Sequence, residues 1–371
     1  MNSECLAPTL SFVIVTWNVR SLVLDCLESL ERHVSKECLF EVIVVDNASR
    51  DGTVEAIRRR FPDVRVLANP TNRGFGAANN QGIRLARGRY IFLLNPDTVV
   101  HAGTVRQLMK VLEEEPEVGV CGPKLVYPDG RVQRSVRSFP TLAAALHRYT
   151  VFRWLKIFRQ AYRRWRCDGF DYEQPADVDQ LMGAAMLFRR EVLEQTGGFD
   201  ERFFMYFEEV DLCYRVKQAG WRLRYVPEAV VTHFAGQSSS QRPAESKADE
   251  IKSLIQFLEK HPKLRGRVPG YRWLLRGGVC LHQVAKALSC ALNLPLFALV
   301  GAWDSVAEQW RKTTSALRVA WLTARDAFHD SSTPPDNSSH CFTSVVDQAS
   351  SISSFSPLNA ETNETQQSEA A

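Results

Sequence analysis

Short apolar runs alternate with helix-like stretches through the N-terminal part of the chain. The runs are rich in β-branched and aromatic residues, and the helix-like stretches lie at 21–35, 53–61 and 74–85. The runs are 11–16 (SFVIVT), 40–46 (FEVIVVD), 64–69 (VRVLAN) and 89–95 (RYIFLLN). Continuous apolar runs of this length indicate strands that helices cover on both faces. The alternation therefore predicts an α/β fold with a doubly wound, mostly parallel sheet flanked by helices.

Polar residues follow each predicted strand. Ligands of open α/β sheets bind at the carboxyl ends of the strands, so these positions are where chemistry is expected. The strand ends are Thr16-Trp17-Asn18, Asp46-Asn47, Asn69 and Asn95-Pro96-Asp97.

The pattern changes after about residue 118. Residues 124–134 (KLVYPDGRVQR) predict a hairpin around a Pro-Asp-Gly turn. Residues 182–200 indicate a strand followed by a helix, and residues 222–234 indicate a last strand. Helices are expected after about Ser238.

A basic segment, 147–166, carries seven Lys and Arg residues and no acid. We expect a helix here, because its apolar residues form one helical stripe, which consists of Val151, Leu155, Phe158, Tyr162 and Trp165. Such a helix favours contact with an anionic membrane surface, with Trp154, Phe158 and Trp165 at the interface. The alternative is a solvated helix packed over the sheet. Residues 287–303 are uncharged but shorter than the ~20 residues that span a bilayer, so a buried or interfacial helix is expected there.

The composition is that of a globular protein, with 45% hydrophobic and 24% charged residues among 371. A net charge of +4 gives no argument for nucleic acid as a partner. The nine cysteines include no CxxC pair, and the N-terminus lacks a basic stretch followed by an apolar one. We therefore expect the catalytic part in the cytoplasm, at the inner face of the cell membrane where the basic segment docks.

Residues 44–53 (VVDNASRDGT) end a strand in Asp46 and continue into a turn and a helix. An Asx turn and a helix cap explain the residues after Asp46 but require no acid at that position. A carboxylate at a strand end is typical of a contact with a ribose or a base edge. A Rossmann dinucleotide site is excluded, because TWNVRS stands where G-x-G-x-x-G is required.

Residues 72–83 (NRGFGAANNQGI) place two glycines in front of a helix. The glycines alone are consistent with a simple tight turn, but helix N-terminal amides together with Arg73 favour a phosphate. The lysine and the Ser or Thr of a Walker loop are missing, so ATP hydrolysis is not expected.

Asn95 and Asp97 follow the fourth strand and offer the oxygen ligands that a divalent cation prefers. The alternative is an Asn-Pro-Asp turn with a capping aspartate. His233 ends the last predicted strand and is either a structural histidine or a further metal ligand.

Three acids, Glu208, Glu209 and Asp211, begin a predicted helix in FFMYFEEVDLCYR (203–215). The helix dipole accounts for acids in a first turn. Glu208 and Asp211 share a face and Glu209 does not. One acid is therefore expected to pair with Arg215, while another faces the ligand cleft.

In their order, these motifs resemble glycosyltransferase family 2, and most closely its bacterial rhamnosyltransferase-like members with the GT-A fold. The resemblance covers about residues 10–240 and rests on VTWN, VVDNASRDGT, NRGFGAANNQGI, LLNPD, MGAAMLFRREVLEQTGGFDERFFMYFEEVDLCYR and VTH. It implies a GT-A catalytic domain at 1–240, with nucleotide-sugar binding in 10–125 and the acceptor and catalytic part in 126–240. A helical extension is expected at 241–330, and a disordered polar tail at 331–371.

The resemblance also implies roles for single residues. Asp97 matches the last acid of the family's metal-binding D-x-D, with Asn95 in place of its first Asp, and His233 matches a further metal ligand. Asp46 matches the acid that reads a pyrimidine base. The implied nucleotide-sugar site consists of Thr16, Asn18, Asp46, Asn47, Arg73, Gly74, Asn95 and Asp97.

Glu208 and Glu209 occupy the family's Glu-Asp site, whose second acid is the catalytic base. This makes Glu209 the first candidate for the base and leaves Asp211 as the second. The implied acceptor site consists of Met182, Gly183, Phe204, Tyr206 and Glu208.

Together these implications predict an inverting glycosyltransferase that moves a sugar, with rhamnose favoured, to a hydroxyl of a glycan or lipid-linked acceptor. A carboxylate takes the hydroxyl proton, and Mg²⁺ or Mn²⁺ on Asp97 stabilises the leaving diphosphate. The favoured donor is dTDP-rhamnose, with UDP- and GDP-sugars as alternatives. Two other classes remain: a sugar nucleotidyltransferase and a non-catalytic nucleotide-sugar-binding protein.

Overall fold

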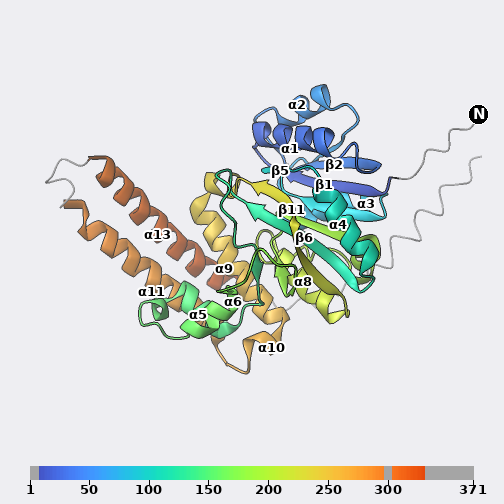
Figure 1. Cartoon of the computed structure of the whole chain (residues 1–371). Coiled ribbons are helices and arrows are strands. Elements are labelled where there is room, and N and C mark those ends of the chain that lie inside the picture. The colour runs from blue at the N-terminus through green and yellow to red at the C-terminus, as the bar shows by residue number, and fades with distance from the viewer. Residues whose placement is uncertain (1–7, 296–302, 331–371) are drawn as a thin grey trace, which may run out of the picture. The chain divides into compact units, whose positions relative to one another are not determined.

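Four parallel strands form the N-terminal part of the sheet, as the apolar runs predict. The computed structural model describes residues 8–295 and 303–330 (Figure 1). The strands are β1 (Leu10–Thr16), β2 (Phe40–Asp46), β3 (Arg65–Ala68) and β4 (Tyr90–Leu94), and the helices between them are α1 (Arg20–His33), α2 (Thr53–Arg60) and α3 (Phe75–Leu85). Strand β1 pairs in parallel with both β2 and β4, so that Thr16 stands opposite Asp46.

The second part of the sheet is mixed, because β10 runs antiparallel between β4 and β6. Its elements are β5 (Thr98–Val100), α4 (Thr104–Glu114), β6 (Val118–Val126), β8 (Ala176–Val178), β10 (Ala185–Arg189), α7 (Arg190–Thr196), α8 (Glu208–Gln218) and β11 (Arg222–His233). Within the described residues, nine strands follow the order β3-β2-β1-β4-β10-β6-β11-β5, with β8 on β11. A separate small ladder joins β7 (Val136–Arg137) to β9 (Gln180–Leu181). The predicted fold class is confirmed.

Helices cover both faces of this sheet, because side chains alternate along each strand. Phe12 of β1 belongs to a buried cluster that contains Leu27 of α1. The next residue, Val13, belongs to the opposite cluster, together with Ala78 of α3 and Leu212 of α8. Helices α3 and α8 therefore share one face of the sheet.

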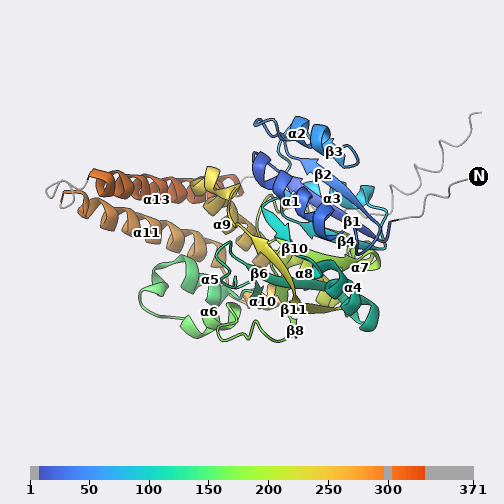
Figure 2. The ribbon, with the colours of Figure 1, turned by 45° about the horizontal axis from the view of Figure 1, so that its top comes forward.

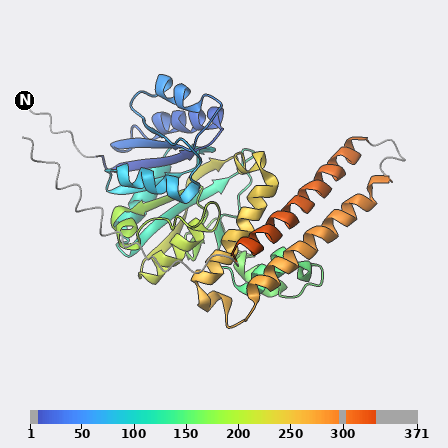
Figure 3. The ribbon, with the colours of Figure 1, turned by 180° about the vertical axis from the view of Figure 1, so that it is seen from behind.

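The helical elements outside the sheet come from two parts of the chain. They are α5 (Leu142–Tyr149), η1 (Val151–Arg153) and α6 (Arg159–Trp165), and later η2 (Ser239–Gln241), α9 (Pro243–Lys260), α10 (Pro262–Arg265), α11 (Tyr271–Leu292) and α13 (Trp303–Asp330). Helices α11 and α13 lie side by side and extend away from the sheet in all three views (Figures 1, 2 and 3). Across the described residues, none of the helices combines the length and the apolarity that a membrane crossing needs.

The prediction of one continuous helix over 147–166 is wrong. The segment divides into the end of α5, the single turn η1 and the short helix α6. Lys156 and Phe158 adopt left-handed backbone conformations, with φ of 57° and 60°, and these interrupt the helix. Trp165, expected at a membrane interface, is buried, and the Arg148 guanidinium lies over its ring. Trp154 and Phe158 are exposed, as expected.

Three other expectations are met only in part or lie outside the described residues. The Pro-Asp-Gly turn forms, but its second arm makes only the isolated bridge between Val126 and Val132. Of the expected interfacial helix at 287–303, the first residues belong to α11, and 296–302 lie outside the described residues. The tail at 331–371 also lies outside the described residues.

Gly82 tests the close packing of α3 on β1. A Cβ at this position would lie 2.3 Å from Cγ1 of Val13. Gly82→Ala is expected to lower the free energy of unfolding by about 1–3 kcal/mol, because the core must shift. In the control Gly277→Ala, on α11, the new Cβ meets nothing within 4 Å, so no loss of stability is expected. Equal melting temperatures for both variants would contradict the close approach.

Candidate active site

A cavity of about 450 Å³ opens at the carboxyl ends of β1 and β4. Most of the predicted site residues line it, although they come from segments far apart in the sequence. These residues are Thr16, Asn47, Gly74, Asn95, Asp97, Met182, Gly183, Phe204, Tyr206, Glu208, Glu209 and His233. The structure therefore brings Asp97 and Glu209 to one cavity.

Gly74 joins the two sides of this cavity. The backbone N–H of Phe75 donates to the carbonyl of Phe204 over 2.9 Å. Gly74 has φ of 86°, and a Cβ there would lie 2.4 Å from the same carbonyl oxygen. Asn47 Nδ2 donates to the Gly74 carbonyl and fixes the loop from the β2 side. Only glycine fits here, both for its backbone conformation and for the contact.

Asp97 and His233 form a pair on one wall of the cavity. Antiparallel pairing of β11 with β5 sets His233 opposite Thr98, and His233 Nε2 lies 3.4 Å from Asp97 Oδ1. Gln133 Nε2 donates to the His233 carbonyl, so Gln133 Oε1 accepts the bond from His233 Nδ1. The other ring nitrogen, Nε2, therefore faces Asp97, and it carries a lone pair when the ring is neutral. Asn95 Oδ1 is buried nearby without a hydrogen-bond partner.

No group of three or more His, Cys, Asp and Glu side chains is gathered as a complete metal site in residues 8–295 and 303–330. A divalent cation at Asp97 and His233 would therefore need further ligands from water or a bound phosphate. Mg²⁺ commonly binds in this way, through one or two carboxylates and the phosphates of a substrate.

Glu208 and Glu209 stand at the N-terminus of α8 and face the cavity. One oxygen of each carboxyl group, Oε2, is buried without a hydrogen-bond partner. Burial raises the pKa of Glu208 well above its ordinary value, and the charge of Glu209 adds to this. Burial also raises the pKa of Glu209, although the Arg137 guanidinium opposes the shift. Two adjacent buried carboxyl groups resist ionising together, so ionisation of one favours the protonated form of the other.

Asp211, the second candidate for the base, does not line the cavity. Its carboxylate is fully buried and accepts bonds from Arg215, Lys260 and His261. Burial raises the pKa of Asp211, but the His261 hydrogen bond and the charges of Arg215 and Lys260 outweigh this and hold the pKa below its ordinary value. The expected pairing of one acid with Arg215 is therefore made by Asp211, which leaves Glu209 as the candidate base.

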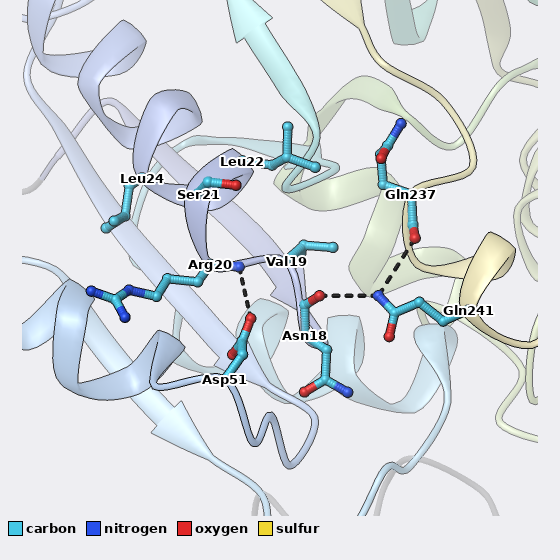
Figure 4. Close-up of a pocket in the computed structure, with 9 residues that line it drawn as sticks. All are labelled: Asn18, Val19, Arg20, Ser21, Leu22, Leu24, Asp51, Gln237 and Gln241. Carbon is cyan, nitrogen blue, oxygen red and sulfur yellow. Dashed lines mark hydrogen bonds between the residues drawn. The ribbon is translucent and has the colours of Figure 1, made fainter.

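Three residues of the predicted nucleotide-sugar site lie beside the cavity rather than on its wall. Asp46 is buried at the end of β2, where Oδ2 accepts from the Ser49 N–H and Oδ1 has no partner. Arg73 is exposed. Asn18 has φ of 52° and lines a shallower pocket next to Asp51 (Figure 4).

This shallower pocket adjoins the main cavity through Gln237, which lines both. Gln241 Nε2 donates to the Asn18 carbonyl and ties the pocket to the segment before α9 (Figure 4).

Several cavity residues carry no sequence motif. Arg137 comes from β7, Arg148 from α5, Gln180 from β9 and Glu250 from α9. Glu250 accepts from Arg148 and from the Tyr149 hydroxyl. Burial lowers the pKa of Arg137, and the charges of Arg166 and Arg148 add to this. Of these four residues only Arg148 had a signal in the sequence, the basic composition of 147–166, which we interpreted as a helix on a membrane surface or a solvated helix packed over the sheet.

Comparisons with known proteins concern the family and the fold of the chain. A sequence model described as "Glycosyl transferase family 2" matches residues 11–197. The chain is similar to the N-acetylglucosaminyl-diphospho-decaprenol L-rhamnosyltransferase of Mycobacterium tuberculosis (strain ATCC 25618 / H37Rv), with 36% identity over 255 residues, which cover 65% of this chain and 81% of that protein. It is also similar to the rhamnosyltransferase WbbL of Escherichia coli (strain K12), with 27% identity over 203 residues, which cover 52% of this chain and 73% of that protein.

Among solved structures, the chain is similar to the mannosyltransferase PcManGT from Pyrobaculum calidifontis in complex with GDP-Man and Mn²⁺. The TM-score is 0.50 at 20% identity, over 88% of each chain. At this identity the likeness concerns the fold, which is of the GT-A type.

Asp211 gives a prediction about stability and pH. Asp211→Asn is expected to lower the free energy of unfolding at pH 7 by about 3 kcal/mol, because it breaks a buried ion pair. A lowered pKa means that the stabilisation is present above the unfolded pKa of about 3.9 and is lost as pH falls through the folded pKa. The gap in melting temperature between wild type and variant should therefore be full at pH 7 and pH 5 and shrink below about pH 4. A gap that does not change with pH would contradict this.

Proposed function

Because the chain belongs to glycosyltransferase family 2, we propose that it transfers rhamnose from a nucleotide sugar, with dTDP-rhamnose as the favoured donor, to a hydroxyl of a lipid-linked glycan. It is a glycosyltransferase, which sets aside the nucleotidyltransferase and the non-catalytic binding protein considered from the sequence. The observation that carries the proposal is the single cavity lined by both Asp97 and Glu209. The two rhamnosyltransferases support the choice of sugar, and the decaprenol-linked sugar in the name of one supports a lipid-linked acceptor.

In the proposed reaction, the Glu209 carboxylate takes the proton of the acceptor hydroxyl as its oxygen attacks the anomeric carbon of the donor. The bond from that carbon to the diphosphate breaks in the same step, and the electron pair leaves with the diphosphate. A single displacement of this kind inverts the anomeric centre. Glu208, whose pKa lies well above its ordinary value, keeps its proton and offers a hydrogen bond to the acceptor.

The donor site consists of the rim formed by β1, β2 and the loop before α3. Thr16 Oγ1 and Asp46 Oδ1 are buried without partners on neighbouring strands, so both are available to a nucleoside. Buried polar groups without partners carry a free-energy cost, which a ligand that bonds to them removes. Gly74 leaves the amides at the start of α3 close to the donor, where Arg73 adds a positive charge.

The residues around Asp97 fit Mg²⁺ or Mn²⁺. The Asp97 carboxylate, the Nε2 lone pair of His233 and the unpartnered Asn95 oxygen lie on one wall of the cavity. Gln133 orients the imidazole from behind, as residues outside the first ligand shell of metal sites commonly do. When bound, a divalent cation supplies Lewis-acid stabilisation of the charge on the leaving diphosphate. The Mn²⁺ named for the PcManGT complex supports this cofactor.

The protein is proposed to work in the cytoplasm, in peripheral contact with the inner face of the membrane. Trp154 and Leu155, which follow η1, are exposed by 55% and 65%. The segment that holds them is basic, which suits an anionic lipid surface. A lipid-linked acceptor requires the enzyme to approach that surface.

Glu209→Gln tests the assignment of the base. Wild-type protein should release nucleoside diphosphate faster from dTDP-rhamnose than from UDP- or GDP-sugars when a lipid-linked glycan is present. The variant should lose about 10²–10⁴-fold in kcat, because the carboxamide takes no proton, while dTDP affinity stays within a few-fold. Turnover in wild type should rise with pH as the Glu209 carboxyl, whose pKa is raised, ionises.

The matched control is Glu113→Gln, an exposed acid of α4, which should keep wild-type turnover. Wild-type kcat in Glu209→Gln would move the base to another residue. No nucleotide release from any donor in the panel would overturn the proposed function itself.

Asp97→Ala tests the metal site. Calorimetry of dTDP with and without Mn²⁺ should show metal-dependent binding in wild type and its loss in the variant, because the ligand that links cation and phosphates is gone. The matched control is Asp63→Ala, an exposed acid after α2. Equal Mn²⁺-dependent binding in wild type and Asp97→Ala would remove the metal from this position.

A further inference from the structure

A second cavity of about 450 Å³ lies next to the candidate active site, between the α5–α6 segment, α9 and α11. We call it the basic pocket. Five Lys and Arg side chains line it, and no carboxylate among the described residues does so. The five cations are Arg148, Arg153, Arg166, Lys247 and Lys286.

The positive charge of the basic pocket is only partly neutralised. Glu250 serves two of the cations, accepting from Arg148 Nη2 over 2.8 Å and from Lys247 Nζ over 2.6 Å. Arg153, Arg166 and Lys286 make no ion pair within the described part of the chain. An anion bound here would meet three cations without a protein partner.

The same excess of positive charge lowers the pKa of two groups beside the basic pocket. Burial lowers the pKa of His282, and repulsion from Arg153, Lys286 and Lys247 lowers it further. Burial likewise lowers the pKa of Lys247, with repulsion from Arg148 and Lys286 opposing its attraction to Glu250. His282 Nδ1 is buried without a hydrogen-bond partner. These groups suit a ligand that brings negative charge.

Arg148 connects the basic pocket to the candidate active site, because it lines both cavities. The Tyr149 hydroxyl and Arg148 bind the same oxygen of Glu250, which itself lines the active-site cavity. A ligand that occupies both cavities would therefore pass over this buried Arg–Glu pair. Its sugar end would face Glu209, and its anionic part would lie among the cations.

Exposed apolar side chains lie beside the basic pocket. Trp154, which follows the pocket residue Arg153 in the sequence, is exposed by 55%, and Leu155 by 65%. Trp154 stacks on the pocket residue His282 with ring centroids 4.8 Å apart. A cationic pocket bordered by exposed apolar side chains matches an amphipathic ligand.

Gly278 allows α11 to pack closely against the turn between α5 and η1. A Cβ at Gly278 would lie 2.7 Å from Cγ2 of Thr150, the residue between α5 and η1. Helix α11 therefore packs closely on this turn and holds Lys286 across the pocket from Arg153.

We propose that the basic pocket binds the diphosphate of a lipid-linked acceptor, and that the exposed ring of Trp154 contacts the first part of its hydrocarbon chain. The proposal rests on the proposed function and names the substrate class of the same site. Arginine suits this role, because its planar fork binds phosphate oxygens in pairs. The diphosphate fixes the distance between the lipid and the reacting sugar, so it positions the hydroxyl at Glu209.

The test compares two triple variants by calorimetry with farnesyl diphosphate, in saturating dTDP and Mn²⁺ so that the donor site is filled. Arg153→Ala/Arg166→Ala/Lys286→Ala should bind farnesyl diphosphate at least about tenfold more weakly than wild type, because three charge-assisted contacts are lost. Lys36→Ala/Arg58→Ala/Arg59→Ala removes the same charge from exposed positions, one after α1 and two on α2, and should bind within about twofold of wild type. Equal weakening in both variants, or none in the first, would overturn the proposal.

Two further measurements test the charge of the pocket and distinguish the acceptor diphosphate from a lipid headgroup. Lys286→Glu changes a single exposed side chain, so the variant is expected to fold. It should weaken binding of farnesyl diphosphate more than Lys286→Ala does. Flotation with phosphatidylglycerol vesicles examines lipid headgroups, which carry a similar phosphate. Loss of vesicle binding in the first triple variant with unchanged farnesyl diphosphate binding would overturn the acceptor assignment.

Nucleotide release from dTDP-rhamnose by wild type, measured in parallel, reports on the proposed function separately. Release of nucleoside diphosphate, with equal farnesyl diphosphate binding by wild type and the first triple variant, would contradict the pocket proposal alone. A difference in binding without release from any donor would defeat the proposed function and leave the anion site.

Discussion

The contact between the loop before α3 and the carbonyl of Phe204 decides the geometry of the site. Gly74 has no side chain, so the two backbones approach closely, and the Phe75 N–H completes the contact. Two further contacts hold the segment that leads into α8: the pair of hydrogen bonds between Asn80 and Phe199, and the bond from Ser253 Oγ to the Met205 carbonyl. The positions of the carboxyl groups at the start of α8 relative to the Asp97 pair therefore depend on contacts between parts of the chain that are distant in sequence.

Charge is distributed unevenly around this contact. The two glutamates at the start of α8 share a buried wall, and burial opposes their joint ionisation. On the far side of Arg148, cations outnumber carboxylates. A ligand with a neutral sugar at one end and a diphosphate at the other complements both regions. For the acceptor proposed above, the change from an acidic to a basic lining across the Arg148–Glu250 pair favours one orientation of the ligand.

The sequence was informative wherever one local pattern determined the structure. Continuous apolar runs predicted the strands, since a run buried on both faces has few other solutions. The rim residues followed from the strand ends and the family resemblance. The break between η1 and α6 was not predictable, because residues 154–158 contain neither glycine nor proline. A tertiary contact accompanies it: His147 Nδ1 donates to the carbonyl of Ile157. The helical phase placed Glu208 and Asp211 on one face and did not predict that only Glu208 lines the cavity. Asp211 instead pairs with His261, which is distant in the sequence.

Helix α9 limits how far this chain can be shortened without loss of the cavity. Glu250 lines the active-site cavity, and Ser253 Oγ donates to the Met205 carbonyl, so α9 supports the loop that carries Tyr206. Trimming the polypeptide at the predicted boundary of residue 240 would remove a wall of the reaction chamber along with the helices beyond it. A variant with less exposed apolar surface should instead keep every helix and replace exposed leucines of α11, such as Leu281 and Leu288, with polar residues.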